Sequence, residues 1–157
     1  MAGFAQGPYT VQNKSKYVGN KVPYFRSSWE LAFMRWCDNH PNILKWASES
    51  IAIPYLNPFT GRHANYIPDF MIQYVDRDGR EHVELIEIKP STQTTLEAAR
   101  GKREEAQAML NAAKWTAAQE WCQRKGIRFK VLNENQIFQT NKPRQPKKRI
   151  PRKRPKK

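Results

Sequence analysis

Residues 82–90 read HVELIEIKP, a mostly aliphatic stretch that also carries Glu87 and Lys89. Its aliphatic and β-branched side chains favour a strand, in which residues two apart share a face. Glu87 and Lys89 therefore lie on one face, and Ile86 and Ile88 lie on the other. Apolar residues on both faces indicate a central strand. Burying a charge without a partner costs several kcal/mol, so we expect the remainder of the chain to supply partners for these two charges.

A hairpin connects this strand to the one before it. Residues 66–75 (YIPDFMIQYV) predict a strand, and the DRDGR that follows suits a three-residue loop with Gly79 in the left-handed conformation. Centring the hairpin on the middle residue of that loop places Asp69 opposite Glu87, with Cβ atoms about 5 Å apart. Two carboxylates at that distance repel each other unless positive charge bridges them. Lys89 supplies part of that charge, and a divalent cation that prefers oxygen ligands, Mg²⁺ or Mn²⁺, would supply more.

The flanking segments predict helices and further strands. Ser27 with Glu30 three residues later is a capping-box pattern for a helix over 28–39, which Pro41 ends. The other predicted elements are a strand at 49–56, a loop at 57–65, a helix from about 96 to 125 with Thr94 and Glu97 as its capping box and Gly126 as its stop, and a strand at 127–132. This order predicts an α/β fold in which a mixed sheet is flanked by helices.

The charge of the chain is positive and unevenly distributed. The formal net charge is +14, and residues 142–157 hold ten Lys or Arg and no acid, which leaves +4 for the rest. Such a chain predicts a polyanionic partner, most often nucleic acid, with a solubility tail as the alternative. The basic segment has too little apolar content to fold alone. We expect an irregular arm over 1–20, one domain over 21–140 and a disordered basic tail over 141–157.

Other features exclude several classes of protein. No apolar run approaches the roughly 20 residues of a membrane span, and the N-terminus lacks the apolar core of a signal peptide. Cys37 and Cys122 are too far apart for a zinc signature, and we expect both to be reduced core residues of a cytosolic protein.

The paired motifs resemble those of the PD-(D/E)XK nuclease superfamily. PD at 68–69 matches the first half of that pattern and EIK at 87–89 matches the second. SSWE, which ends in Glu30, resembles the helix-borne metal-ligand glutamate of the TnsA-like members. Longer stretches resemble the head-completion nucleases of T-even-type tailed phages over roughly residues 24–132, namely FRSSWELAFMRWCDNHPNILKWASESIAIPY, IPDF, LIEIKP, AKWTAAQEWC and FKVL.

The resemblance implies a restriction-endonuclease-like core and a Mg²⁺-dependent DNA endonuclease, with Mn²⁺ as a substitute. It would act during phage head completion, in the host cytoplasm or in association with the virion. Asp69, Glu87 and the main-chain carbonyl of Ile88 would hold the metal. Glu30 would support or complete the site, and Lys89 would orient or help deprotonate the attacking water. From the residues alone, a helix-cap role and a metal-ligand role are equally expected for Glu30.

Basic residues would supply DNA binding through phosphate contacts. Those expected to contact DNA are Lys102, Arg103, Lys114, Arg124 and Lys125 on or near the second helix and Lys147, Lys148, Arg149, Arg152, Lys153 and Arg154 in the tail. Gln107 and Lys114 could neighbour the active site, but a solvated helix face is the favoured interpretation for both. Glu84 is assigned to the opposite face of its strand and His82 to the strand surface.

Two alternative functions stay open. A non-catalytic, DNA-binding structural protein of head completion would keep this fold, and a repair or transposition nuclease would share the chemistry. The tail could bind DNA or a virion protein, so capsid and portal proteins are candidate partners.

Overall fold

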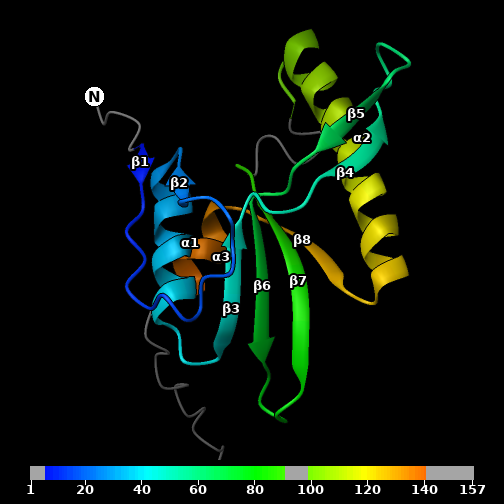
Figure 1. Ribbon diagram of the computed structural model, residues 1–157. Coiled ribbons are helices and arrows are strands. Elements are labelled where there is room, and N and C mark those ends of the chain that lie inside the picture. Colours follow the sequence, from blue (N-terminus) through cyan, green and yellow to red (C-terminus); the bar gives the residue numbers. More distant parts are fainter. Residues whose placement is uncertain (1–5, 91–98, 141–157) are drawn as a thin grey trace, which may run out of the picture.

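A four-stranded mixed sheet forms the centre of the computed structural model, which describes residues 6–90 and 99–140 (Figure 1). Its strand order is β3-β6-β7-β8, in which β8 is parallel to β7 and the other neighbours are antiparallel. The strands are β3 (Ile43–Ser48), β6 (Phe70–Val75), β7 (Glu81–Ile88) and β8 (Arg128–Leu132). The predicted α/β fold with a mixed sheet is therefore confirmed, and HVELIEIKP lies in an interior strand.

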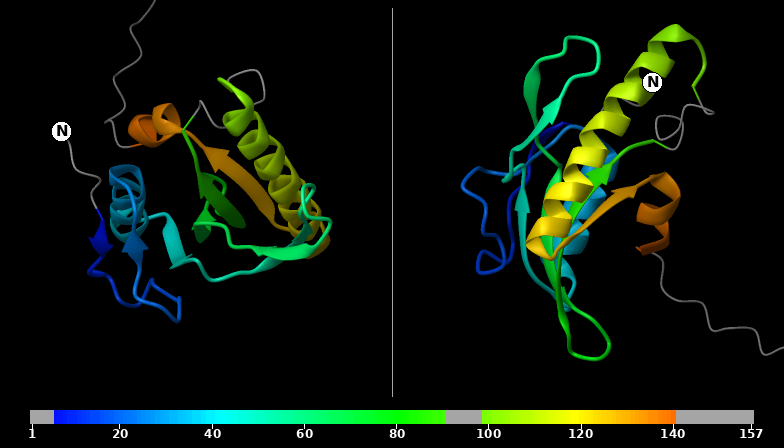
Figure 2. Two further views of the ribbon diagram at one scale, coloured as in Figure 1. Left: turned by 90° about the horizontal axis from the view of Figure 1, so that it is seen from above. Right: turned by 90° about the vertical axis from the view of Figure 1, so that its right-hand side faces the viewer.

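Helices cover both faces of this sheet. The helices α1 (Ser28–Asn39) and α3 (Glu134–Thr140) lie on one face and α2 (Lys102–Lys125) lies on the other (Figure 2). Ile86 and Ile88 pack into the core beneath α1, whereas Leu85 packs into a second core beneath α2. The strand is apolar on both faces because each face meets a helix.

The hairpin between β6 and β7 has the predicted register. Its ladder runs from the pair Phe70 and Ile86 to the pair Val75 and Glu81, and Gly79 has a φ of 77°. The strand expected at 66–75 starts only at Phe70, because Tyr66 ends a different hairpin and residues 67–69 connect the two.

That second hairpin corrects two sequence predictions. The strand predicted at 49–56 is β4 (Ile53–Leu56), and it pairs with β5 (His63–Tyr66), whose first three residues fall in the predicted loop 57–65. The sheet position that 49–56 was expected to take belongs to β3, which was not predicted. The last three residues of β3 are all buried, so the strand shows no alternation of buried and exposed residues. Glu49, which has a φ of 48°, follows the end of the strand.

The second helix starts later than predicted. It begins at Lys102 rather than near 96, after Gly101, whose φ is 93°. Glycine adopts such a conformation without the steric cost that a side chain would bring. The predicted capping box at 94–97 lies outside the described residues. Gly126 ends the helix as predicted, with its N–H bonded to carbonyls of the last turn, and α3 was not predicted.

The N-terminal segment packs onto the sheet although most of it lacks regular structure. Two short strands, β1 (Gly7–Pro8) and β2 (Tyr24–Phe25), pair with each other. Asp38, which is 0% exposed, accepts hydrogen bonds from the Tyr9 hydroxyl at 2.6 Å and the Gln12 N–H at 2.7 Å. Burial alone would raise the pKa of Asp38, but these bonds outweigh it and lower that pKa. A charged carboxylate therefore anchors the segment.

Two further predictions concern the core and the tail. Cys37 and Cys122 are buried free thiols, as expected. Within the ranges that the structure describes, no helix has the length and apolar character needed to cross a membrane. The basic tail predicted over 141–157 lies outside those ranges.

Candidate active site

Asp69 and Glu87 meet at one end of the two interior strands, where β6 begins and β7 ends. The register of the two strands, extended by one residue, puts Asp69 opposite Glu87. Oδ2 of Asp69 accepts a hydrogen bond from the N–H of Ile88 at 2.8 Å. The predicted proximity of the two carboxylates is therefore confirmed, and a main-chain bond holds Asp69 against β7.

The environment of this pair concentrates negative charge. Glu87 is 5% exposed and Asp69 is half-buried. Burial, and then the charge of Glu87, raises the pKa of Asp69 well above its usual range. Burial also raises the pKa of Glu87, against opposing effects of the Tyr66 hydroxyl and the Lys89 ammonium. The groups around the pair thus offset only part of the cost of ionising both acids.

Tyr66 fixes the orientation of Glu87. The Tyr66 hydroxyl, on β5, donates a hydrogen bond to Oε2 of Glu87 at 2.7 Å. Burial, and then the charge of Glu87, raises the pKa of Tyr66, so the phenol stays a donor. The sequence did not indicate Tyr66 as a site residue, because no local pattern connects a tyrosine to a glutamate 21 positions away.

Two lysines flank the pair. Nζ of Lys89 lies 3.7 Å from Oε1 of Glu87. Nζ of Lys114, on α2, lies 5.9 Å from the ring centre of Tyr55 and 6.0 Å from that of Tyr66. Burial, and then the charge of Lys89, lowers the pKa of Lys114. Lys114 therefore belongs to the surroundings of the site, and the solvated-face interpretation is wrong for it.

Gln107 lies about two turns before Lys114 on the same helix and is exposed. Its Nε2 donates a hydrogen bond to Oδ1 of the buried Asn111 at 3.1 Å. Its exposure agrees with the favoured interpretation of a solvated helix face.

Glu30 has a capping role in this structure. Ser27 is the N-cap of α1, and its hydroxyl accepts from the N–H of Glu30 at 3.1 Å. Oε2 of Glu30 accepts in turn from the N–H of Arg26 at 2.6 Å, one residue before the position that a standard capping box would use. Burial raises the pKa of Glu30, and the bond from Arg26 opposes that rise. The negative charge of Glu30 also contributes to the raised pKa of Asp69. Glu30 is thus a cap within electrostatic range of the carboxylate pair.

Glu49 is a further acid close to Asp69, and the sequence did not indicate it as a site residue. Its N–H donates to the carbonyl of Asp69 at 2.9 Å, and its carboxylate pairs with the guanidinium of Arg26. Its φ of 48° lies in the left-handed region, which costs a non-glycine residue about 1 kcal/mol or more. The strained residue links the start of β6 to the segment that caps α1.

The donor set of the pair fits a hard cation. Within residues 6–90 and 99–140, no three His, Cys, Asp or Glu side chains are grouped so that they alone could hold a metal ion. Mg²⁺ is usually bound through one or two carboxylates, with water and substrate phosphate supplying other ligands. Two adjacent carboxylates with raised pKa values provide the oxygen donors and the uncompensated charge that such an ion requires.

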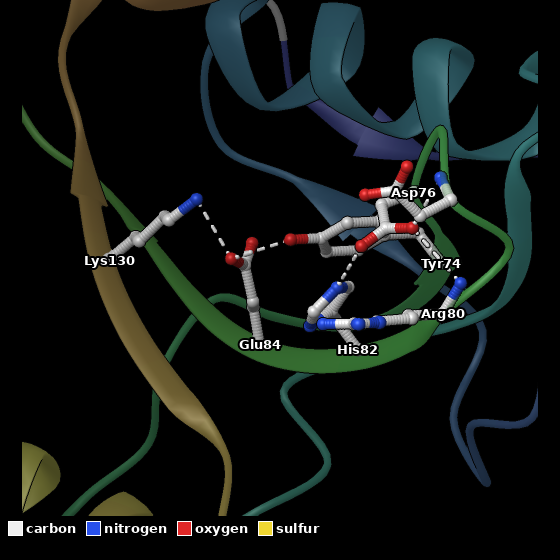
Figure 3. A network of polar contacts seen from close by, with 7 residues as sticks. Tyr74, Asp76, Arg80, His82, Glu84 and Lys130 are labelled. Carbon is white, nitrogen blue, oxygen red and sulfur yellow. Dashed lines mark hydrogen bonds and ion pairs between the residues drawn. The ribbon is translucent and has the colours of Figure 1, made fainter.

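The opposite face of β7 carries a different buried acid. Glu84 is 3% exposed, and its Oε1 accepts from the Tyr74 hydroxyl at 3.0 Å and lies 2.8 Å from Nζ of Lys130 (Figure 3). Nε2 of His82 lies 2.7 Å from Oδ2 of Asp76. The assignment of Glu84 to the face opposite Glu87 is confirmed, since its neighbours come from the face beneath α1.

The predicted DNA-contacting cations are divided between separate places. Lys102 and Arg103 are exposed in the first turn of α2, and Arg124 and Lys125 are exposed in its last turn. A helix of 24 residues is about 36 Å long, so these pairs form two separate basic patches. The predicted cations of the tail, Lys147 to Arg154, lie outside the described residues.

The P-D motif and the E-x-K motif meet at one end of two interior strands of a mixed sheet, which lies between helices. This arrangement defines a nuclease with the restriction-endonuclease-like fold. Residues 40–134 match the family described as TnsA-like endonuclease N terminal. The chain is also 36% identical over 141 residues to the head completion nuclease of Enterobacteria phage T4, covering 82% of this chain and 91% of that protein. The chain belongs to the TnsA-like endonuclease family.

Proposed function

We propose that this endonuclease hydrolyses DNA phosphodiester bonds with Mg²⁺ at the Asp69–Glu87 site, and that it acts in phage head completion. The observation that carries the proposal is the adjacent pair of carboxylates beside Lys89, one on buried Glu87 and one on half-buried Asp69. The similar T4 protein is named for head completion and for nuclease activity. Mn²⁺ would substitute for Mg²⁺ because both ions prefer oxygen ligands.

The residues of the site divide the work. Asp69 and Glu87 would hold the ion together with the carbonyl of Ile88, while the Tyr66 hydroxyl keeps Glu87 in one orientation. When bound, the ion would neutralise the phosphate, lower the pKa of water and stabilise the leaving oxygen. Lys89, whose ammonium lies beside Oε1 of Glu87, would orient the attacking water and help remove its proton.

Glu30 would support the site through its charge while it caps α1. Its carboxylate bonds to the main chain of Arg26 and contributes to the field at Asp69. A ligand role for Glu30 would require its side chain to leave the Arg26 N–H. This requirement makes the cap and the ligand roles separable by experiment.

Binding of DNA would rest on phosphate contacts. Lys102, Arg103 and Lys114 of α2 and the ten cations of residues 142–157 supply positive charge without a base-reading element. Capsid or portal proteins would be the partners during assembly, and the host cytoplasm, or the virion itself, would be the place of action.

The test uses two glutamates of the same strand. Purified full-length protein is incubated with linear, circular and branched DNA, with and without Mg²⁺, and compared with Glu87→Gln and Glu84→Gln. Both acids are buried to a similar degree, 5% and 3% exposed, but they face opposite sides of the sheet. We expect cleavage only with Mg²⁺, its loss in Glu87→Gln and its retention in Glu84→Gln. Wild-type cleavage by Glu87→Gln would overturn the site, and DNA binding without cleavage by the wild-type protein would favour a structural role in head completion.

A further inference from the structure

The β4–β5 hairpin projects from the sheet alongside α2 (Figure 1). Its turn carries Phe59, whose exposed fraction is 55%, and β4 ends in Leu56, which is 54% exposed. Single exposed apolar residues are normal on protein surfaces. Phe59 differs from such residues in its hydrogen-bonded turn, in the connection of its hairpin to the candidate active site and in the charge of that hairpin.

The turn that presents Phe59 is well ordered by hydrogen bonds. Oδ1 of Asn57 accepts from the N–H of Phe59 at 2.8 Å and from that of Thr60 at 3.3 Å. The main chain of Asn57 exchanges bonds with Gly61 and Arg62, each at 2.9 Å. Gly61 has a φ of 67°, which closes the turn without strain. The aromatic ring is thus held out by a fixed scaffold, and little ordering entropy is lost when a partner binds.

The hairpin is joined directly to the candidate active site. Tyr66, the last residue of β5, donates to Glu87, and Lys114 of α2 lies over the rings of Tyr55 and Tyr66. Six residues separate Tyr66 from Phe59, and a strand rises about 3.3 Å per residue, so Phe59 lies within about 20 Å of Tyr66, whose hydroxyl contacts Glu87. DNA rises about 3.4 Å per nucleotide, so that span covers roughly six nucleotides.

The charge of the hairpin suits a polyanion. From Ile51 to Pro68 the chain contains no acidic residue, whereas Arg62 and His63 are exposed beside the turn. A phosphate backbone that reaches the carboxylate pair would meet no like charge on this hairpin.

We propose that Phe59 stacks on an unpaired nucleobase of the DNA substrate, within about six nucleotides of the cleaved bond. The proposal rests on the proposed function and deepens it, because it makes branched or frayed DNA the preferred substrate. Aromatic side chains stack on any base, whereas bases inside a paired duplex are already stacked on each other. The hairpin would therefore select DNA structure rather than sequence.

The cleavage test compares two substrates of equal sequence content, a fully paired duplex and a duplex with a single-stranded branch, in Mg²⁺. We expect the full-length wild-type protein to cut the branched DNA faster. Phe59→Ala should reduce that preference roughly fivefold to 150-fold, the contribution of one base–aromatic stack, while cleavage of paired duplex persists. Phe59→Trp should restore the preference, and Phe59→Leu, which is apolar but has no ring, should not. Val22→Ala is the control, since Val22 is 72% exposed in the N-terminal segment.

A binding test separates this proposal from the proposed function. Branched DNA carrying 2-aminopurine at unpaired positions is titrated with full-length protein in EDTA, so that no cleavage is needed. Quenching by the wild-type protein and by Phe59→Trp, but not by Phe59→Ala, supports stacking even if no Mg²⁺-dependent cleavage is found. An unchanged cleavage preference and unchanged quenching in Phe59→Ala would overturn the stacking proposal and leave the nuclease site intact.

Discussion

Asp69→Asn should stabilise the metal-free protein while abolishing Mg²⁺-dependent cleavage. The substitution removes one negative charge from the Asp69–Glu87 pair. The asparagine Oδ1 can still accept the hydrogen bond that Asp69 takes from the N–H of Ile88 at 2.8 Å. Stability and activity should therefore change in opposite directions.

The size of the stabilisation follows from the geometry of the pair. Residues directly opposed in neighbouring strands have Cβ atoms about 5 Å apart, and two unit charges at that distance repel by about 3 kcal/mol at an effective dielectric constant of about 20. A bond to a neutral amide oxygen is about 1 kcal/mol weaker than one to a carboxylate. The net gain is about 2 kcal/mol, which for a chain of this size raises Tm by about 4–8 °C.

The effect should depend on pH in a defined direction. The pKa of Asp69 in the folded protein lies well above its usual range, because of burial and the charge of Glu87. Folded protein therefore binds more protons than unfolded protein in the pH range between the ordinary and the raised pKa, and its free energy of unfolding falls as pH rises through that range. The advantage of Asp69→Asn should be largest near the alkaline end of a scan from about pH 4 to about pH 8, and small at the acidic end.

Thermal unfolding followed by circular dichroism, in EDTA across that pH range, measures this difference. Asp78→Asn is the control, because Asp78 is exposed in the turn between β6 and β7. A lower Tm for Asp69→Asn at the alkaline end, or an equal gain at both ends of the range, would refute the reasoning. Residual Mg²⁺-dependent cleavage at the wild-type rate would refute the role of Asp69.

Four other changes have expected outcomes. Glu30→Gln should keep Tm within about 1 °C, because glutamine still caps α1, and should lose cleavage, because the negative charge is removed. Normal cleavage in Mg²⁺ would leave only the cap role. Tyr66→Phe should reduce cleavage about tenfold or more. The Tyr66 bond lowers the pKa of Glu87, so its loss should raise that pKa and shift the acidic limb of the pH–rate profile to higher pH. An unchanged limb would contradict a positioning role. Asp38→Asn should lower the free energy of unfolding at neutral pH by about 2 kcal/mol or more, because the pKa of Asp38 is lowered in the folded state. The difference should shrink steadily as pH falls below about 4, the ordinary pKa of an aspartate, and denaturant unfolding across that range measures it. Truncation after Asn141 should weaken DNA binding at low salt, with a slope in log salt that is shallower by about 0.9 for each phosphate that the tail neutralises; an unchanged slope would point to a virion protein as the partner of the tail.

The parts of the fold that were predicted correctly depend on short-range patterns. The aliphatic and β-branched side chains of residues 82–90 and the glycine turn at 76–80 act between residues a few positions apart, and the turn sets the register of the β6–β7 hairpin. Ser27 likewise caps α1 as its local pattern indicated. The missed strand β3 has no such turn beside it, because its partner β6 lies more than twenty positions further along the chain, where Ser48 pairs with Phe70.

That Asp69 and Glu87 are neighbours could be predicted from the sequence, because a hairpin with a defined turn and period-two strands permits one register. The residues that surround them depend on how distant segments fold together. Tyr66 reaches Glu87 from a separate hairpin, Lys114 reaches the site from α2, and Glu49, in a left-handed conformation, donates its N–H to Asp69. These contacts join segments that approach one another only when both faces of the sheet are covered, so no local periodicity records them.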